Sequence, residues 1–175
     1  MLTRAWAPEL PGVIEVCPAV ADAGSEIYFG SSLQVSGFRA MQDGLHYVKL
    51  SDTVAVSAQI HAVDMAHIAA AGYQVVINNR PDGEAPGQPS SDEMQAAALS
   101  AGLEYHYYPL NAFNYPGADV PAMADLFDGS RPVFAFCRSG TRSSNLWISS
   151  RAASEQDQAR RHAQQLGFDV SMSFG

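Results

Sequence analysis

Short apolar runs alternate with helical segments along most of this chain. The runs at 74–77 and 132–136 have the length and apolar character of buried strands, and the aromatic run at 105–108 predicts a third strand. Each run ends in a polar loop, and a stretch with helical spacing follows that loop. Strands that alternate with helices in this way form a mainly parallel sheet with helices on both faces. We therefore expect an α/β fold.

Polar residues just before the helical stretches predict where the helices begin, because their side chains can accept hydrogen bonds from the first turn. Glycines predict where the helices end. The predicted caps are Asp64, Ser90, Asp119 and Ser154, and the predicted stops are Gly72, Gly102, Gly129 and Gly167. Ahead of the first helix, residues 47–50 and 54–56 flank a polar turn, which predicts two short strands joined by that turn.

The first 44 residues differ from the rest of the chain. Pro8, Pro11 and Pro18 interrupt any periodicity, and glycines and serines further along add flexible points. We expect an N-terminal appendage over residues 1–44, ordered only in part. A single α/β domain is expected over residues 45–175.

The loop at 137–143, Cys-Arg-Ser-Gly-Thr-Arg-Ser, joins the last apolar run to a helical segment. Such a loop can turn successive backbone N–H groups toward one point, and the helix adds the positive end of its dipole. Cys137 begins this loop, so its thiolate is favoured and can act as a nucleophile. A buried core thiol is the alternative reading. It does not explain why two arginines, a glycine and three hydroxyl residues follow within six positions.

The other residues of this loop are candidates for binding an anion. Arg142 offers a planar fork that suits an oxyanion, and Ser143 can donate a hydrogen bond from its hydroxyl to the sulfur. Gly140 can adopt the positive φ that a tight reversal requires. We expect the substrate to contact Arg138, Ser139, Gly140 and Thr141. A solvated surface charge is the equally supported reading for Arg138.

Three loops leave the carboxyl ends of the predicted parallel strands, at 78–84, 109–114 and 137–143. Ligands of such sheets bind beyond those ends, so we expect the three loops to converge. Arg80 and Asp82, in the first loop, are therefore candidate substrate-binding residues. Turn chemistry with a local ion pair is the equal alternative for both.

Charge, apolar run length and cysteine content indicate which classes of partner and which cellular compartment are expected. The net charge of −8 argues against a nucleic-acid surface. No apolar run approaches the roughly 18 residues of a membrane span. The two cysteines, Cys17 and Cys137, lie far apart, which suits a reducing cytoplasm. His61, Asp64 and His67 are spaced three apart without a further clustered ligand, so we expect no metal and no cofactor.

Two motifs together resemble a known family. Residues 77–84, Ile-Asn-Asn-Arg-Pro-Asp-Gly-Glu, precede the loop at 137–143, as in the phosphatase-like domain of the beta-lactamase hydrolase-like proteins. The resemblance implies a fold like that of tyrosine and dual-specificity phosphatases. It also implies that Cys137 is the nucleophile, Arg142 the oxyanion clamp and Ser143 the hydroxyl next to the thiolate.

Members of the family that this chain resembles are labelled sulfur transferases or phosphatases. Some are fused to a metallo-beta-lactamase-like domain that oxidises persulfides. The His-x-His-x-Asp-His pattern of that domain does not occur in this sequence. A separate persulfide-oxidising enzyme of the metallo-beta-lactamase fold is therefore an expected partner, and the expected substrate is a small sulfane or phosphate compound.

Two departures from the phosphatase pattern favour sulfur transfer. Tyrosine phosphatases place five residues between the cysteine and the arginine, whereas four separate Cys137 from Arg142, as in rhodanese sulfurtransferases. The loop at 109–114 carries no carboxylic acid to protonate a leaving alkoxide. Sulfite, which leaves from thiosulfate, needs no proton. We expect a rhodanese-like sulfurtransferase that forms a persulfide on Cys137 and passes the sulfur to a thiol.

Two alternatives to sulfur transfer stay open. The first is a phosphatase that works through a phosphocysteine on Cys137, with Asp82 or Asp119 as a substitute acid. The second is a module without catalysis that binds oxyanions or senses redox state through the same loop.

Overall fold

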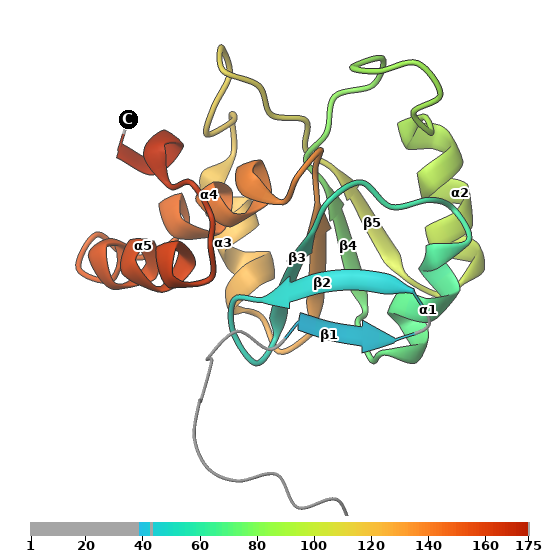
Figure 1. Cartoon of the computed structure of the whole chain (residues 1–175), viewed down its shortest axis with the longest axis horizontal. Helices are drawn as coiled ribbons and strands as arrows, with labels where there is room; N and C mark the ends of the chain where they lie inside the picture. Colours follow the sequence, from blue (N-terminus) through green and yellow to red (C-terminus); the bar gives the residue numbers. More distant parts are fainter. Residues whose placement is uncertain (1–38, 43, 175) are drawn as a thin grey trace, which may run out of the picture. The chain divides into compact units, whose positions relative to one another are not determined.

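The computed structural model describes residues 39–42 and 44–174, so most of the predicted appendage lies outside the described residues. Within them the backbone forms a six-stranded sheet in the order β1-β2-β3-β6-β4-β5 (Figure 1). The strands are β1 (Arg39–Gln42), β2 (Leu45–Lys49), β3 (Val54–Ser57), β4 (Val75–Asn78), β5 (Glu104–Tyr107) and β6 (Val133–Phe136).

The sheet is mainly parallel, which confirms the predicted fold class. β3, β6, β4 and β5 are parallel to their neighbours. On the other side of β3, β2 pairs with β3 and β1 pairs with β2, and both of these pairs are antiparallel. β1 lies before residue 45, where we placed the start of the domain, and Arg39 of β1 pairs with Val48 of β2. The sequence Arg-Ala-Met-Gln of β1 has little apolar character, so pairing with β2, not its own pattern, defines it as a strand.

Five α-helices and one short 3₁₀ helix accompany the sheet in the described part of the chain. They are α1 (Asp64–Ala70), α2 (Ser91–Ser100), α3 (Val120–Asp128), α4 (Thr141–Ser149), α5 (Gln156–Gln165) and η1 (Ser171–Phe174). Across residues 39–42 and 44–174, every helix is too short or too polar to cross a lipid bilayer.

Two of the four predicted helix caps are confirmed. The Ser90 hydroxyl accepts the Glu93 N–H, and the Asp119 carboxylate accepts the Ala122 N–H. The other two were wrong. Asp64 is the first residue of α1, and its carboxylate accepts the N–H of His61 before the helix. α5 begins after Glu155, and no side chain caps it, so Ser154 lies outside the helix.

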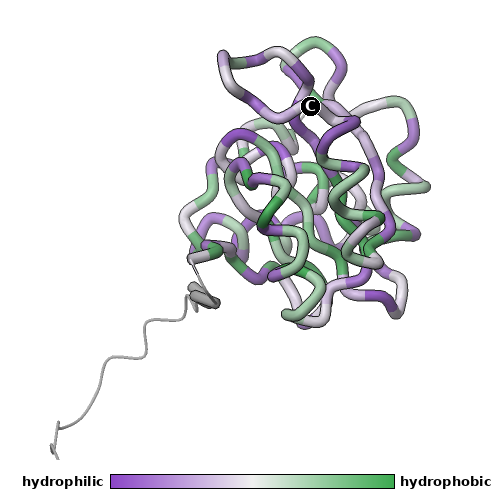
Figure 2. The backbone as a smooth tube through the Cα atoms, turned by 90° about the vertical axis from the view of Figure 1, so that its right-hand side faces the viewer, coloured by the Kyte–Doolittle hydropathy of each residue, from purple (hydrophilic) through white to green (hydrophobic). Residues whose placement is uncertain are grey.

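The helices cover both faces of the sheet (Figure 1). α1 and α2 bury Met65, Ile68 and Met94 in one apolar cluster, together with Phe134 and Phe136 of β6. A second cluster joins α3, α4 and α5 to Val133 and Ala135, which alternate with those phenylalanines along β6. Hydrophilic segments lie on outer loops and along helical turns (Figure 2). β6 is therefore buried on both faces, and this packing fixes the position at which the following loop begins.

Candidate active site

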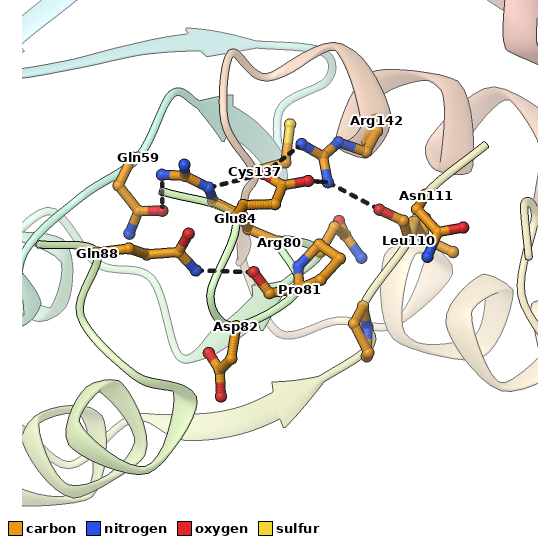
Figure 3. A network of polar contacts seen from close by, with 12 residues as sticks. Gln59, Arg80, Pro81, Asp82, Glu84, Gln88, Leu110, Asn111, Cys137 and Arg142 are labelled. Atoms are coloured by element: carbon orange, nitrogen blue, oxygen red, sulfur yellow. Dashed lines mark hydrogen bonds and ion pairs between the residues drawn. The ribbon is translucent and has the colours of Figure 1, made fainter. Parts of the chain in front are cut away.

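Cys137 directly follows β6, and its sulfur lies at the start of α4 (Figure 3). The N–H of Gly140 donates a hydrogen bond to Cys137 Sγ at 3.1 Å, and the N–H of Cys137 donates to the Ser57 carbonyl at 3.4 Å. Cys137 has no exposed surface. Its sulfur nevertheless has a polar neighbour in the Gly140 N–H, and the Arg142 side chain lies nearby (Figure 3). The surroundings of the sulfur therefore differ from those of an apolar core thiol.

Gly140 adopts the left-handed conformation that the sequence predicted for it. Its φ is 88°, and a Cβ at this position would lie 3.1 Å from the ring of Phe168. The positive φ therefore favours glycine, and a Cβ would also require the Phe168 ring to shift by a few tenths of an ångström. This turn directs the Gly140 N–H at the sulfur and starts α4 at Thr141, so the second half of the motif is the first turn of a helix.

Arg142 is held by a carboxylate that the sequence analysis left without a role. Its Nη1 and Nη2 donate to the two carboxylate oxygens of Glu84 at 2.7 and 2.9 Å, and Nη1 also donates to the Leu110 carbonyl at 2.8 Å (Figure 3). Burial is the largest single influence on the pKa of Arg142, and it lowers that pKa. The contributions of Glu84 and the Cys137 sulfur together exceed the effect of burial, so the pKa of Arg142 lies above its ordinary value. Arg142 therefore remains a cation beside the sulfur.

Glu84 also binds Arg80, so one carboxylate joins two arginines. Arg80 Nε donates to Glu84 at 2.9 Å, and Arg80 Nη1 donates to the side-chain oxygen of Gln59 at 2.9 Å. The hydrogen bond from Arg142 lowers the pKa of the Glu84 carboxyl. Burial raises this pKa, and the hydrogen bond from Arg80 lowers it further. Glu84 is therefore anionic at neutral pH. Arg80 reaches the site through Glu84, as the convergence of the loops predicted, and its contact with a substrate stays a prediction.

The structure does not bring Asp82 to the cysteine. Its carboxylate accepts the N–H of Ser91 at 2.8 Å, at the start of α2, and its own N–H donates to the Tyr107 hydroxyl at 2.9 Å. In Figure 3 the side chain points away from Cys137. Turn chemistry explains Asp82, because the free N–H groups of a helix start attract a carboxylate.

Ser143 does not donate to the sulfur in this structure, contrary to our expectation. Its hydroxyl donates to the side-chain oxygen of Asn79 at 2.8 Å, and both residues are fully buried. The amide nitrogen of Asn79 donates to the Tyr108 carbonyl at 2.9 Å. This second bond fixes the orientation of the amide, so the oxygen faces Ser143 and takes the only hydroxyl hydrogen that Ser143 has.

Asn79 also joins all three loops that leave the carboxyl edge of the sheet. Its backbone N–H donates to the Phe136 carbonyl at 2.8 Å, and its carbonyl accepts the Leu110 N–H at 3.0 Å. Together with the side-chain bonds to Ser143 and Tyr108, these contacts confirm that the loops converge. The sequence analysis missed Asn79, although it quoted the Asn-Asn pair as part of a motif.

The remaining loop residues lie on the outer side of the turn. Arg138 and Ser139 are exposed, and the Ser139 hydroxyl donates to the Thr141 hydroxyl at 3.1 Å. The bridge between Ala58 and Ser139 ties this side of the loop to the end of β3. A role of Arg138, Ser139 and Thr141 in substrate binding stays a prediction.

This arrangement places groups that favour an anion around a sulfur atom that is buried in this structure. The first turn of α4 offers backbone N–H groups and the positive end of the helix dipole, and Arg142 adds a cation. Within residues 39–42 and 44–174, no three His, Cys, Asp or Glu side chains gather closely enough to hold a metal ion.

Several known proteins are similar to this chain in sequence and in fold. Residues 45–154 match the family model of the beta-lactamase hydrolase-like protein, phosphatase-like domain. A beta-lactamase hydrolase-like protein of Xylella fastidiosa (strain 9a5c) is 35% identical over 134 residues, which are 72% of this chain and 30% of that protein. This chain therefore spans less than a third of the length of that curated relative.

Solved structures agree with the sequence match. The crystal structure of a candidate phosphatase from Neisseria meningitidis is 33% identical and has a TM-score of 0.60, covering 70% of this chain and 89% of that one. The active form of a protein named Tk-PTP shares the fold at 17% identity, with a TM-score of 0.55 over 73% of this chain and 90% of that one. The fold is therefore that of tyrosine and dual-specificity phosphatases. The chain belongs to the phosphatase-like domain family of the beta-lactamase hydrolase-like proteins.

Proposed function

We propose that this chain hydrolyses phosphate monoesters through a phosphocysteine on Cys137. The observation that carries the proposal is the position of the Cys137 sulfur, which accepts the Gly140 N–H at 3.1 Å beside Arg142 at the start of α4. The family and the fold shared with a candidate phosphatase support hydrolysis. Sulfur transfer, which the sequence favoured, has no comparable support and becomes the second candidate.

The reaction proceeds in two displacements. The Cys137 thiolate attacks phosphorus, an S–P bond forms, and the bond from phosphorus to the leaving oxygen breaks with its electron pair on that oxygen. The N–H groups of the first turn of α4 and the Arg142 guanidinium stabilise the charge on the other phosphate oxygens. Water then attacks the phosphocysteine, the S–P bond breaks, and dihydrogen phosphate leaves with both protons of that water. The thiolate is thereby restored.

The leaving group determines which esters fit best. In the described part of the chain, Asp82 and Asp119 already accept helix N–H groups, and Glu84 is held as an anion by two arginines. None of these three carboxyls is poised to give a proton to a leaving oxygen. A phenolate is stable enough to leave without a proton, whereas an alkoxide is not. The proposed substrates are therefore aryl phosphates.

Access to the sulfur is part of the proposal. Cys137 has no exposed surface in this structure, so the side chains around it must move when the phosphate enters. Glu84 is a candidate, because it occupies two N–H groups of Arg142 that a phosphate oxygen can also use. Its side chain lies in a loop and is 26% exposed.

Sulfur transfer remains the second candidate because of the short spacing between Cys137 and Arg142. Four residues separate them, so the loop encloses less space than the phosphatase loop to which it is compared. A sulfane sulfur is smaller than a tetrahedral phosphate. Its transfer also needs no acid, which suits the engaged carboxyls.

One pair of assays tests the proposal. We expect hydrolysis of 4-nitrophenyl phosphate well above background, lost in Cys137→Ser, and trapping of a phosphocysteine visible by intact mass. In parallel, the protein is treated with thiosulfate and its mass measured. A mass gain of one sulfur, lost in Cys137→Ser, without hydrolysis of any aryl phosphate would replace the phosphatase proposal with sulfur transfer.

A further inference from the structure

Glu84 occupies the edge of Arg142 at which an oxyanion can be held by two parallel hydrogen bonds. Its carboxylate oxygens accept hydrogen bonds from Arg142 Nη1 and Nη2 at 2.7 and 2.9 Å (Figure 3). Nη1 also donates to the Leu110 carbonyl at 2.8 Å. Arginine holds carboxylates and phosphates with the same fork of N–H groups. Two phosphate oxygens and the Glu84 carboxylate therefore exclude each other at this edge of the guanidinium.

The charges around Glu84 favour the same conclusion. One of its oxygens also accepts a hydrogen bond from Arg80 Nε at 2.9 Å, so one negative charge lies between two positive ones. Arg142 and Arg80 are the charged groups that act on the Glu84 carboxyl. The neutral Gln59 binds Arg80 from the segment after β3, and Asp82 points away from this network (Figure 3). An anion that replaces Glu84 therefore meets two positive charges without a carboxylate beside it.

Glu84 lies where its side chain can move. It belongs to the loop between β4 and α2, and its side chain is 26% exposed. The neighbouring Gly83 and Pro86 are exposed as well, and Gly83 has open space around it. Release of the carboxylate therefore requires rotation of a side chain in an exposed loop, and no helix or strand has to unfold.

We propose that Glu84 is an internal competitor of the substrate, because its carboxylate and a bound oxyanion are alternative partners of Arg142. The inference rests on the proposed function, which requires an oxyanion at Arg142. Each oxyanion then binds more weakly than the site alone would allow, since breaking the bonds between Glu84 and Arg142 is part of every binding event. Substrate binding is thereby coupled to a movement of the loop after β4.

Sulfate and methanesulfonate are suitable probes, because both are tetrahedral oxyanions that keep their charge between pH 4 and pH 7. Calorimetry with the full chain measures their affinities. At pH 7 we expect Glu84→Gln to bind sulfate roughly tenfold more tightly than the wild type, since the competing charge is removed. Glu93→Gln, at an exposed position of α2, should bind sulfate like the wild type. A carboxylate that only orients Arg142 predicts weaker binding in Glu84→Gln, so equal or weaker binding overturns the inference.

Methanesulfonate distinguishes displacement from repulsion. The cost of releasing Glu84 is the same for any anion that enters, so Glu84→Gln should increase the affinity for the monoanion and the dianion by the same factor. Repulsion by a carboxylate that stays in place grows with the charge of the anion, so it gives sulfate the larger gain. A clearly larger gain for sulfate, or no binding of either anion to Glu84→Gln, would refute the competition.

A pH series tests the inference without any substitution at Glu84. Cys137→Ser removes the titration of the thiol, and the groups that act on Glu84 are then the two arginines, which stay charged. Because Arg142 and Arg80 lower the pKa of Glu84, its protonation begins below about pH 4.5 and weakens its hold on them. The sulfate affinity of Cys137→Ser should therefore rise as the pH falls through that range. In the double variant with Glu84→Gln this rise should be absent, and a flat profile in Cys137→Ser itself would exclude the competition.

These measurements separate the inference from the proposed function, because neither probe is a phosphate ester. If 4-nitrophenyl phosphate is not hydrolysed but Glu84→Gln gains affinity for both anions equally, the competition stands and the phosphatase proposal fails. If the ester is hydrolysed but the sulfate affinity of Glu84→Gln equals that of the wild type, the phosphatase proposal stands and the competition is rejected.

Discussion

The Ser143 hydroxyl donates its hydrogen to Asn79, so the loop that carries Cys137 is joined through a buried bond of 2.8 Å to the loop that follows β4. Asn79 in turn holds the loop after β5 through Tyr108 and Leu110. The three loops thus share one buried amide. For Ser143 to stabilise the departing thiolate, its hydrogen must move from Asn79 to the sulfur during the reaction.

The first prediction concerns Asn79. We expect Asn79→Ala to lower the free energy of unfolding by about 1–3 kcal/mol, because buried polar groups on two other loops lose their partners. We also expect kcat toward 4-nitrophenyl phosphate to fall roughly tenfold to a hundredfold, since small displacements of catalytic groups have large effects. Denaturant unfolding and steady-state kinetics measure the two effects.

Asn78→Ala is the matched control for that change. Asn78 is also buried, and its amide binds the Tyr105 hydroxyl and the Arg80 N–H without contacting the loop after β6. A similar loss of stability with a much smaller loss of kcat is expected. Equal losses of kcat in the two variants would show that Asn79 has no special role in placing the catalytic loop.

The second prediction separates the shape of Arg142 from its charge. Arg142→Lys keeps a cation but cannot reproduce two parallel bonds to Glu84 and one to Leu110. We expect kcat/KM to fall by roughly 10²–10³, the usual loss when one preorganised donor to the reacting oxygens is removed. Arg161→Lys, at an exposed position of α5, is the control and should retain wild-type kinetics. Wild-type kinetics in Arg142→Lys would contradict the role of the planar fork.

The third prediction follows from the lowered pKa of Glu84. A carboxyl whose pKa is depressed in the folded state stabilises the fold above its unfolded value, here 4.5, and this stabilisation is lost as the pH falls through the folded value. The melting temperature of the wild type should therefore fall as the pH is lowered below about 4.5, in part because Glu84 becomes protonated. Glu84→Gln should have a lower melting temperature than the wild type at pH 7, and it should lack the contribution of Glu84 to the fall in acid.

Glu93→Gln serves as the comparison for Glu84→Gln, because Glu93 is exposed on α2 and no ion pair involves it in the described part of the chain. Thermal melts between pH 3 and pH 7 would be recorded for all three proteins. Parallel pH profiles for the wild type and Glu84→Gln would mean that the bridge between the two arginines contributes nothing to folding.

The fourth prediction concerns Gly140. Gly140→Ala must place a Cβ 3.1 Å from Phe168 while keeping a φ of 88°, so both stability and hydrolysis should fall. Gly72→Ala has a similar φ of 91° but open space around the new Cβ. It should lose stability through the backbone alone, by about 1–2 kcal/mol, and keep its kcat. A kcat for Gly140→Ala equal to that of the wild type would contradict the need for this turn.

The sequence predicted the parallel sheet and the convergence of the loops because both follow from local patterns. The run Val75–Ile77 in β4 is apolar throughout, as is typical of a buried parallel strand, and side-chain caps such as Ser90 and Asp119 act within one helical turn. The cysteine motif was equally visible, since strand, tight loop and helix are contiguous. The preference for sulfur transfer depended on loop length and a missing acid, whereas the similar solved structure of a candidate phosphatase favours the phosphatase alternative.

The residues that the sequence analysis misjudged are those whose partners lie far away in the chain. Glu84 and Arg142 are 58 positions apart, and Asn79 and Ser143 are 64 positions apart. No local sequence pattern can therefore predict either contact. Asp82 failed for the opposite reason. Its position in a motif suggested the site, but the nearby start of α2 offered free N–H groups that its carboxylate reaches first.

The place of β6 between β3 and β4 has a consequence for how the protein opens. Hydrogen-bonded margins fray before interior strands do, and here the margins are β1 and β5. Either one can peel away while the strand ahead of Cys137 keeps a neighbour on each side. Amide exchange should accordingly be slowest along 133–136, which leaves Cys137 anchored during the partial openings that a folded protein undergoes most often.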